Sequence, residues 1–368
     1  MITYIYEHKD WPHFHWEQEV LAVKLGAVRH RQGRIMGHME ALGFPLQEEA
    51  MLAILTLDIV KTNEIEGELL NPEQVRSSVA RKLGMDIPGL IPSDRHIEGV
   101  VEMMLDATLR YDLPLTEERL FDWHAAMFPT GRSGMYKITV AGWRDDSKGP
   151  MQVVSGAAGK EQIHFQAPHA DTIAKEIQTF LDWFNENINI DPVLKAAVAH
   201  LWFLTIHPFA DGNGRIARAV ADMQLARADQ TSLRFYSMSA QIKRERNAYY
   251  KIVERTQKGS LDITRWLEWF IDCLERTLIA TEEILSAVLK KGRYWDKHIA
   301  VALNERQRLM INKLFDGFEG NLTSSKWAKI TKCSQDTALR DIQDLVDKGM
   351  LEKTSSGGRN TSYVLKTD

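Results

Sequence analysis

The chain has 368 residues, of which 44% are hydrophobic and 26% charged, a composition typical of a soluble globular protein. At roughly 100–200 residues per domain, we expect two or three domains. The net charge of −4 gives the whole chain no attraction to nucleic acid or anionic lipid. No apolar run approaches the roughly 18 residues of a membrane helix, and the first residues do not resemble a signal peptide. Cys273 and Cys333 form no CxxC pair, so we expect reduced thiols in a cytoplasmic protein.

The spacing of apolar residues predicts a mainly helical chain. The first three helices are expected over 17–42, 47–63 and 72–84, followed at 85–95 by a turn-rich stretch that is a candidate domain boundary. Short β-like runs separated by turn sequences within 131–168 predict a hairpin or flap. Further helices are expected over 94–110, 116–128, 170–187, 191–206, 213–228, 239–257, 262–272 and 274–290.

The last stretch reads as a winged helix, with a helix–turn–helix followed by two short strands around SSGG. Its helices are expected over 304–316, 323–330 and 334–348. The third would be the recognition helix, but it carries four aspartates against Arg340 and Lys348, and the wing adds Lys353 and Arg359. DNA binding is therefore less favoured than a role in dimerisation or protein docking. The expected domains are 1–92, a core at 93–295 and the winged helix at 296–368.

Residues 207–218 read HPFADGNGRIAR and concentrate the chemistry of the chain. The apolar helix before them would hold His207 rigidly as a general base. The glycines at 212 and 214 let the backbone approach a ligand, and the N-terminus of the next helix is an anion site. Arg215 and Arg218, three apart, share one helix face and suit phosphate, and Asp211 suits Mg²⁺. This combination favours phosphoryl or nucleotidyl transfer.

The stretch resembles the Fic/Doc family motif HPFx(D/E)GNGRxxR at every defined position, and the resemblance extends over about 95–290. It implies a Fic-type helical core with a hairpin flap, and transfer of AMP from ATP to a Ser, Thr or Tyr hydroxyl of a target protein. His207 would then be the catalytic base and Asp211 the ligand of Mg²⁺.

The same resemblance implies how ATP is held. In it, Gly212, Asn213 and Gly214 would cradle the phosphates, and Arg215 and Arg218 would bind the β- and γ-phosphates. The run RNAYYKIVE at 246–254 falls where Fic proteins line the adenine pocket. The candidates there are Tyr249, Tyr250 and Asn247.

Residues 62–67, TNEIEG, resemble the Fic inhibitory motif (S/T)xxxE(G/N), with Thr62, Glu66 and Gly67 at the defined positions. The resemblance implies that Glu66 pairs with Arg218. An arginine held by a carboxylate is not available to the γ-phosphate of ATP.

Other interpretations stay open. The fold also supports phosphate transfer in Doc-type members, although their motif departs from GNGRxxR, and removal of AMP in some members that keep the inhibitory glutamate. A different class is a winged-helix DNA-binding regulator whose core only senses nucleotide. The expected partners are ATP and a target protein that the sequence does not identify. Self-modification and a homodimer are compatible with the sequence, and a membrane partner is not expected.

Overall fold

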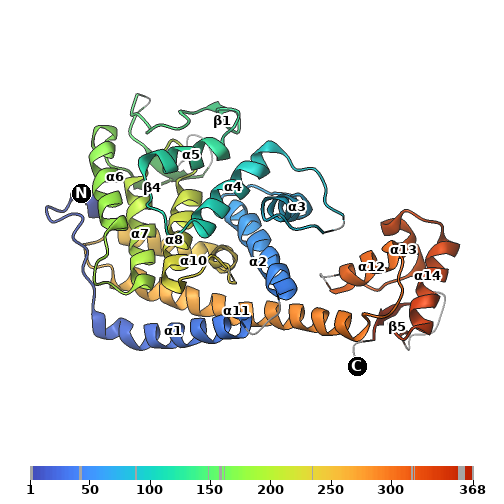
Figure 1. Cartoon of the computed structure of the whole chain (residues 1–368). Coiled ribbons are helices and arrows are strands. Elements are labelled where there is room, and N and C mark those ends of the chain that lie inside the picture. Colours follow the sequence, from blue (N-terminus) through green and yellow to red (C-terminus); the bar gives the residue numbers. More distant parts are fainter. Residues whose placement is uncertain are drawn as a thin grey trace. The chain divides into compact units, whose positions relative to one another are not determined.

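The structure, a computed structural model, is mainly helical with three small antiparallel strand pairs (Figure 1). It divides into two compact units, residues 1–282 and 283–368. The domain boundary expected near residue 93 stays a prediction. No helix among the described residues is long and apolar enough to cross a membrane. The structure describes residues 3–40, 44–87, 89–147, 149–156, 160, 162–233, 235–315, 318, 320–354 and 361–366.

The chain begins with a short 3-10 helix and three α-helices: η1 (Ile5–Glu7), α1 (Gln18–Glu40), α2 (Phe44–Ile65) and α3 (Pro72–Lys82). Helix α1 runs alongside α11 (Thr264–Lys297), and Lys24 donates to Asp272 at 2.7 Å (Figure 1). Helix α3 starts where the sequence has helix-start signals, because the side chain of Asn71 accepts the N–H of Glu73 at 2.9 Å and proline follows it.

The rest of the first unit is built around α7 (Pro192–Ile206), which is buried along almost its whole length. Its sequence, PVLKAAVAHLWFLTI, is apolar on nearly every face, as expected of a helix surrounded by others. Helix α8 (Asn213–Asp229) packs directly against it. The remaining helices of this unit are α4 (Arg95–Leu109), α5 (Glu117–Met127), η2 (Ala170–Thr172), α6 (Ile173–Asn185), α9 (Met238–Arg244) and α10 (Arg246–Gln257).

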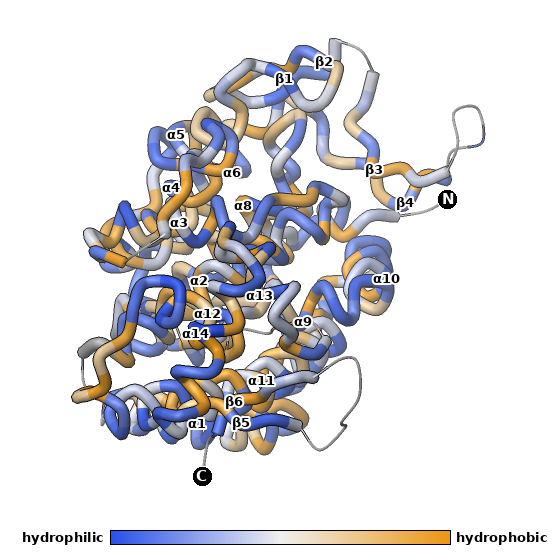
Figure 2. The backbone as a smooth tube through the Cα atoms, turned by 90° about the vertical axis from the view of Figure 1, so that its right-hand side faces the viewer, coloured by the Kyte–Doolittle hydropathy of each residue, from blue (hydrophilic) through white to orange (hydrophobic). Residues whose placement is uncertain are grey.

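The expected flap consists of two separate hairpins. The first pairs β1 (Arg132–Ser133) with β2 (Tyr136–Lys137), and the second pairs β3 (Gln152–Ser155) with β4 (Gln162–Gln166). Figure 2 shows β3 and β4 side by side, with hydrophobic residues in both. Phe165 of β4 is buried, with Tyr4 and Tyr6 packed against its ring at right angles. The inner end of the second hairpin is therefore anchored in the core.

The second unit has its own hydrophobic core, which includes Trp327, Ile342 and Leu345. It contains the last turns of α11, then α12 (Glu305–Phe315), α13 (Ser324–Thr331), α14 (Gln335–Asp347), β5 (Leu351–Lys353) and β6 (Tyr363–Leu365). These elements follow the expected order of a helix–turn–helix and a strand pair. The expected wing turn SSGG and Arg359 lie outside the described residues.

Two helix predictions were wrong in their boundaries. The helix expected over 239–257 is divided at Glu245, whose backbone leaves the helical region (φ −106°, ψ 23°) while its carboxylate takes two bonds from Arg276 at 2.5 and 2.6 Å. The helices expected over 262–272 and 274–290 are one helix, α11. Neither glycine nor proline stands between residues 264 and 291, and Cys273 is buried inside the continuous helix.

Candidate active site

His207 stands at the end of α7, in a left-handed backbone conformation (φ 51°, ψ 58°) that turns the chain out of the helix. Its Nδ1 lies 3.2 Å from the carbonyl oxygen of Leu204. Because a carbonyl oxygen only accepts, Nδ1 carries the proton and Nε2 is the acceptor of the neutral ring. Burial lowers the pKa of His207 to about 4, so the ring is neutral at neutral pH.

The loop after His207 is held by internal contacts. Phe209 is buried, and its ring stacks on His124 of α5 with the centroids 4.2 Å apart. The Asn213 amide both accepts the N–H of Phe209 at 2.9 Å and donates to its carbonyl oxygen at 2.8 Å. Gly212 adopts φ 83°, which favours glycine. The Asn213 side chain is thus used inside the loop in this structure, and its contact with phosphate stays a prediction.

Asp211 points its carboxylate to the first hairpin, where the hydroxyl of Ser133 donates to Oδ2. Its Oδ1 accepts the N–H of Gly212 at 2.5 Å. Its backbone oxygen lies 3.2 Å from Nε2 of His124, a ring whose pKa burial lowers to about 4. Beside substrate phosphates Mg²⁺ is commonly bound by one or two carboxylates, and its binding by Asp211 stays a prediction. Among the described residues no cluster of three or more acidic, histidine or cysteine side chains could hold a metal by itself.

Arg144 ties the motif to the segment between the hairpins, and the sequence analysis missed it. Its guanidinium donates to the carbonyl oxygens of His207 at 2.8 Å and Pro168 at 2.6 Å, and to Asp146 at 2.8 Å. The side chain is buried, so these bonds are shielded from water. His124 was missed for the same reason: each residue lies far from the motif in sequence and belongs to no local pattern.

Arg218 is buried, and the end of α2 covers it. Its Nε donates to the Thr62 hydroxyl at 2.7 Å, and its Nη2 donates to the Thr62 carbonyl at 2.9 Å and to Glu66 Oε1 at 2.7 Å. Thr62 and Glu66 are one helical turn apart, as the sequence motif expects. The three bonds hold the guanidinium against α2.

The Glu66 carboxylate also covers the first turn of α8. A Cβ atom placed on Gly214 would lie 2.2 Å from Glu66 Oε1, so only glycine leaves room for the carboxylate there. The N-terminus of a helix attracts anions through its unpaired N–H groups and its dipole. Glu66 therefore occupies the place that the sequence analysis assigned to phosphate.

Arg215 is also buried and lies over the ring of Phe128, 5.2 Å from its centroid. Its Nη1 donates to Glu68 Oε2 at 2.6 Å. The same carboxylate oxygen lies 3.3 Å from Nε2 of His96, on α4. Sequence reasoning did not single out Glu68 or His96, because neither belongs to a recognised motif position.

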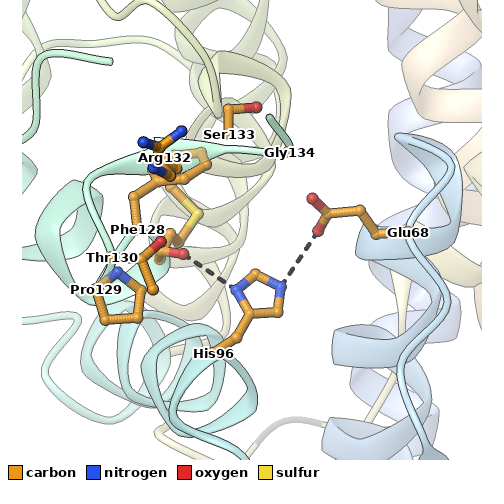
Figure 3. Close-up of a pocket in the computed structure, with 9 residues that line it drawn as sticks. Glu68, His96, Phe128, Pro129, Thr130, Arg132, Ser133 and Gly134 are labelled. Atoms are coloured by element: carbon orange, nitrogen blue, oxygen red, sulfur yellow. Dashed lines mark hydrogen bonds and ion pairs between the residues drawn. The ribbon is translucent and has the colours of Figure 1, made fainter. Parts of the chain in front are cut away.

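Glu68 and His96 form one wall of a pocket of about 200 Å³ beside the motif (Figure 3). Figure 3 shows the side chains of Glu68 and His96 pointing toward one another at one side of the pocket. Arg132 and Ser133 of the first hairpin line the opposite side of the pocket. The remaining lining residues are Met127, Phe128, Pro129, Thr130 and Gly134.

The three candidates for the adenine pocket lie in different surroundings. Tyr249 is buried, and its hydroxyl is 2.8 Å from Nε2 of His200 in α7. The Tyr250 ring is partly exposed, and its hydroxyl donates to the Ile65 carbonyl at 3.3 Å, beside Glu66. Asn247 is exposed. Of the three, Tyr250 presents an accessible ring next to the motif.

Comparison with known proteins finds two family models that match parts of the chain. Residues 114–225 match the model of the Fic/DOC family. This segment of the chain is therefore similar to the Fic/DOC family. Residues 4–85 match a second model, described as a domain of unknown function, DUF4172. The Fic match contains the whole stretch 207–218, and the DUF4172 match contains Thr62 and Glu66.

The curated relatives match only part of this chain. It is 27% identical over 223 residues to the protein adenylyltransferase Fic of Drosophila willistoni, and 26% identical over 223 residues to that of Drosophila yakuba. Each alignment covers 58% of this chain and 39% of the relative. The chain thus spans about two fifths of the length of these relatives.

Solved structures confirm the fold. A Fic family protein from Desulfovibrio desulfuricans has a TM-score of 0.52 at 20% identity, over 93% of this chain and 95% of that one. A Fic domain containing signaling protein from Bacteroides thetaiotaomicron has the same TM-score and identity, over 73% of this chain and 96% of that one. The expected mainly helical Fic fold with small hairpins is therefore confirmed.

Proposed function

We propose that this protein is a Mg²⁺- and ATP-dependent protein adenylyltransferase that is inhibited by its own Glu66. The observation that carries the proposal is the complete motif of 207–218, folded with a neutral histidine at one end and two buried arginines at the other. The similarity to the Drosophila protein adenylyltransferases supports the same reaction class.

His207 acts as the general base in this proposal. With Nδ1 held by the carbonyl of Leu204, Nε2 takes the proton of the target hydroxyl. The hydroxyl oxygen forms a bond with the α-phosphorus of ATP, the bond from that phosphorus to its bridging oxygen breaks, and pyrophosphate leaves. The target side chain then carries AMP through a phosphodiester bond.

The phosphates of ATP would lie at the N-terminus of α8, where Arg215 and Arg218 supply positive charge. Asp211 would hold Mg²⁺, which when bound neutralises charge on the phosphates. Ser133 keeps the Asp211 carboxylate oriented toward the first hairpin. Tyr250 is our candidate for contact with the adenine ring.

Glu66 would inhibit the reaction because it holds Arg218 and covers the same helix N-terminus. A charge-assisted bond of this kind contributes about 1.5–3 kcal/mol, or one to two decades in an equilibrium. We therefore expect Glu66→Gly to raise transfer of AMP by at least about 10-fold. The assay follows ATP labelled at the α-phosphate onto the chain itself and onto proteins of a native lysate.

Three variants make this test specific. Glu64→Gly places the same substitution two residues earlier, in the last turn of α2, at a side chain bound to Lys61 at 2.8 Å, and should not activate. His207→Ala in the Glu66→Gly background should lose transfer by about 10²–10⁴-fold while still binding ATP. Arg218→Ala should be inactive with or without Glu66. Activation by Glu66→Gly in the Arg218→Ala protein would show that Glu66 does not act through Arg218.

A further inference from the structure

We infer that the fold contains a second inhibitory contact, in which Glu68 holds Arg215 just as Glu66 holds Arg218, and His96 positions Glu68. The inference rests on the proposed function, because it concerns access of phosphate to the same two arginines. It also assigns a role to Glu68 and His96, which belong to neither sequence motif.

Both motif arginines are incompletely satisfied in the structure. Arg215 and Arg218 are each about 98% buried. Among the described residues, Nε of Arg215 and Nη1 of Arg218 have no hydrogen-bond partner. A buried donor without a partner is costly, so each guanidinium is an incomplete binding site that phosphate oxygens are suited to complete. The carboxylates of Glu66 and Glu68 balance the two charges until phosphate arrives.

The carboxylates of Glu66 and Glu68 come from a single turn of the chain that follows α2. The carbonyl oxygen of Asn63 accepts the N–H of Glu66 and the N–H of Glu68, each at 3.0 Å. Gly67, between them, adopts φ 90°, a conformation that favours glycine and reverses the chain direction. Arg215 and Arg218 are three residues apart and therefore lie on one face of α8. The turn thus sets one carboxylate against each arginine of that face.

His96 fixes the second carboxylate from the opposite side. Its Nδ1 donates to the Met127 carbonyl at 3.1 Å, which orients Nε2 toward Glu68. The Glu68 contact raises the pKa of His96, and the His96 contact lowers the pKa of Glu68. Arg215 on α8 and Arg132 on the first hairpin are the other cations near this pair. Glu68 therefore contacts Arg215 on one side and His96 on the other, and an anion that binds Nη1 of Arg215 has to displace it.

The consequence is that removing Glu66 alone releases one arginine of two. In the Glu66→Gly protein, Arg215 is still paired with Glu68, so a polyphosphate must displace that carboxylate before it contacts both guanidinium groups. Loss of the Glu68 charge should therefore strengthen polyphosphate binding further.

The test measures binding of tripolyphosphate by calorimetry at constant ionic strength, in the Glu66→Gly background. Adding Glu68→Gln should lower the Kd at least about 5-fold, because Arg215 keeps its positive charge and loses the carboxylate that competes with phosphate. Glu64→Gln removes the same charge two residues before Glu66, where Lys61 is the partner, and should leave the Kd within about 2-fold of the starting value. Glu68→Asp, which keeps the charge but shortens the side chain, should give an intermediate Kd. His96→Gln should tighten binding in the Glu68 protein and have no further effect in the Glu68→Gln protein, since His96 acts through Glu68.

An unchanged or weaker Kd after Glu68→Gln overturns the second contact, whatever the Glu66→Gly protein does with ATP. Conversely, tighter tripolyphosphate binding without transfer of AMP by any variant overturns the proposed function and supports the contact. An equal gain from Glu64→Gln would reduce the effect to general electrostatics and would also overturn it.

Discussion

At the residue scale, three histidines lie around the motif: His124 and His200 are buried, His207 is half-buried, and burial lowers the pKa of each. The His124 ring stacks on Phe209, and Nε2 of His200 forms a hydrogen bond with the Tyr249 hydroxyl. His207 follows the end of α7. Their pKa values are lowered to about 4, 3 and 4, respectively. Neutral rings suit this site, because positively charged histidines would stand beside the already buried charges of Arg215 and Arg218.

This burial makes the stability of the first unit depend on pH. The unfolded chain binds protons at these histidines near pH 6.5, whereas the folded chain resists protonation until about pH 4. Between these values the unfolded state binds more protons, so the free energy of unfolding falls as the pH falls through that window. Each histidine contributes about 1.4 kcal/mol per pH unit, and the loss is absent above pH 6.5.

Urea unfolding between pH 6.5 and pH 5 measures this slope. His200→Gln should reduce the slope of the unfolding free energy against pH by the contribution of about one bound proton. This holds whatever the substitution does to stability at neutral pH. His30→Gln, at an exposed position, is the matched control for loss of an imidazole. If His200→Gln leaves the slope as it was, His200 is protonated in the folded chain and the assigned neutral state is wrong.

The site residues that could be predicted from the sequence lie close together along the chain, whereas those that were missed lie far from the motif in sequence. His207, Asp211, Arg215 and Arg218 lie within twelve residues, so their proximity is visible in the sequence. Arg144 and His124 reach the same loop from other segments. Their roles depend on tertiary packing, which no local spacing encodes.

At the scale of elements, the β3–β4 hairpin is the best candidate for the flap that holds a target. Among the described strands, β3 pairs only with β4, so its other edge has no strand partner there. Val154 and Ile163 are about half exposed at the outer part of the hairpin, whereas Phe165 is buried at its base. An extended target segment could pair with β3 and place its hydroxyl through backbone bonds.

We expect a shortened hairpin, with 154–163 replaced by a two-residue turn, to lose modification of target proteins in the Glu66→Gly background. Phe165 remains, so the anchor of the hairpin in the core is kept. Binding of ATP, measured in parallel, should be unchanged because the motif residues are untouched. Equal labelling of lysate proteins by the shortened and full-length chains would exclude docking on this hairpin.

The element boundaries show why part of the fold was not predictable. The division between α9 and α10 depends on Glu245 meeting Arg276, thirty-one residues away, and that contact has no local signal. The expected break within α11 rested on apolar spacing alone, although no helix-breaking residue stood there. By contrast, the start of α3 was predictable because Asn71 and Pro72 are strong local signals.

At the scale of the whole molecule, the second unit carries charge that is already paired within it. On α14, Asp341 is buried and takes two bonds from Arg306, and Asp344 is bound by Lys348. These aspartates therefore stabilise the packing of the unit. Of the two cations expected on this helix, Lys348 is paired with Asp344, whereas Arg340 is exposed and donates to the backbone oxygen of Asp336. Protein docking or dimerisation therefore stays the favoured prediction for this unit, with DNA binding as the alternative.

Every residue of the proposed transfer reaction lies in the first unit, so removal of 298–368 should leave ATP binding and AMP transfer by the Glu66→Gly protein within about 2-fold. The choice of labelled lysate proteins, or the molecular mass in solution, should change instead. Removal of 298–368 would expose Tyr294, because this side chain is buried in the core of the second unit and its hydroxyl donates to the Met350 carbonyl at 2.7 Å. The truncated chain should therefore carry Tyr294→Gln, and the full-length chain with Tyr294→Gln is its control. If a truncated chain that still unfolds cooperatively loses ATP binding, the second unit contributes to the active site, and the separation of chemistry from target choice is wrong.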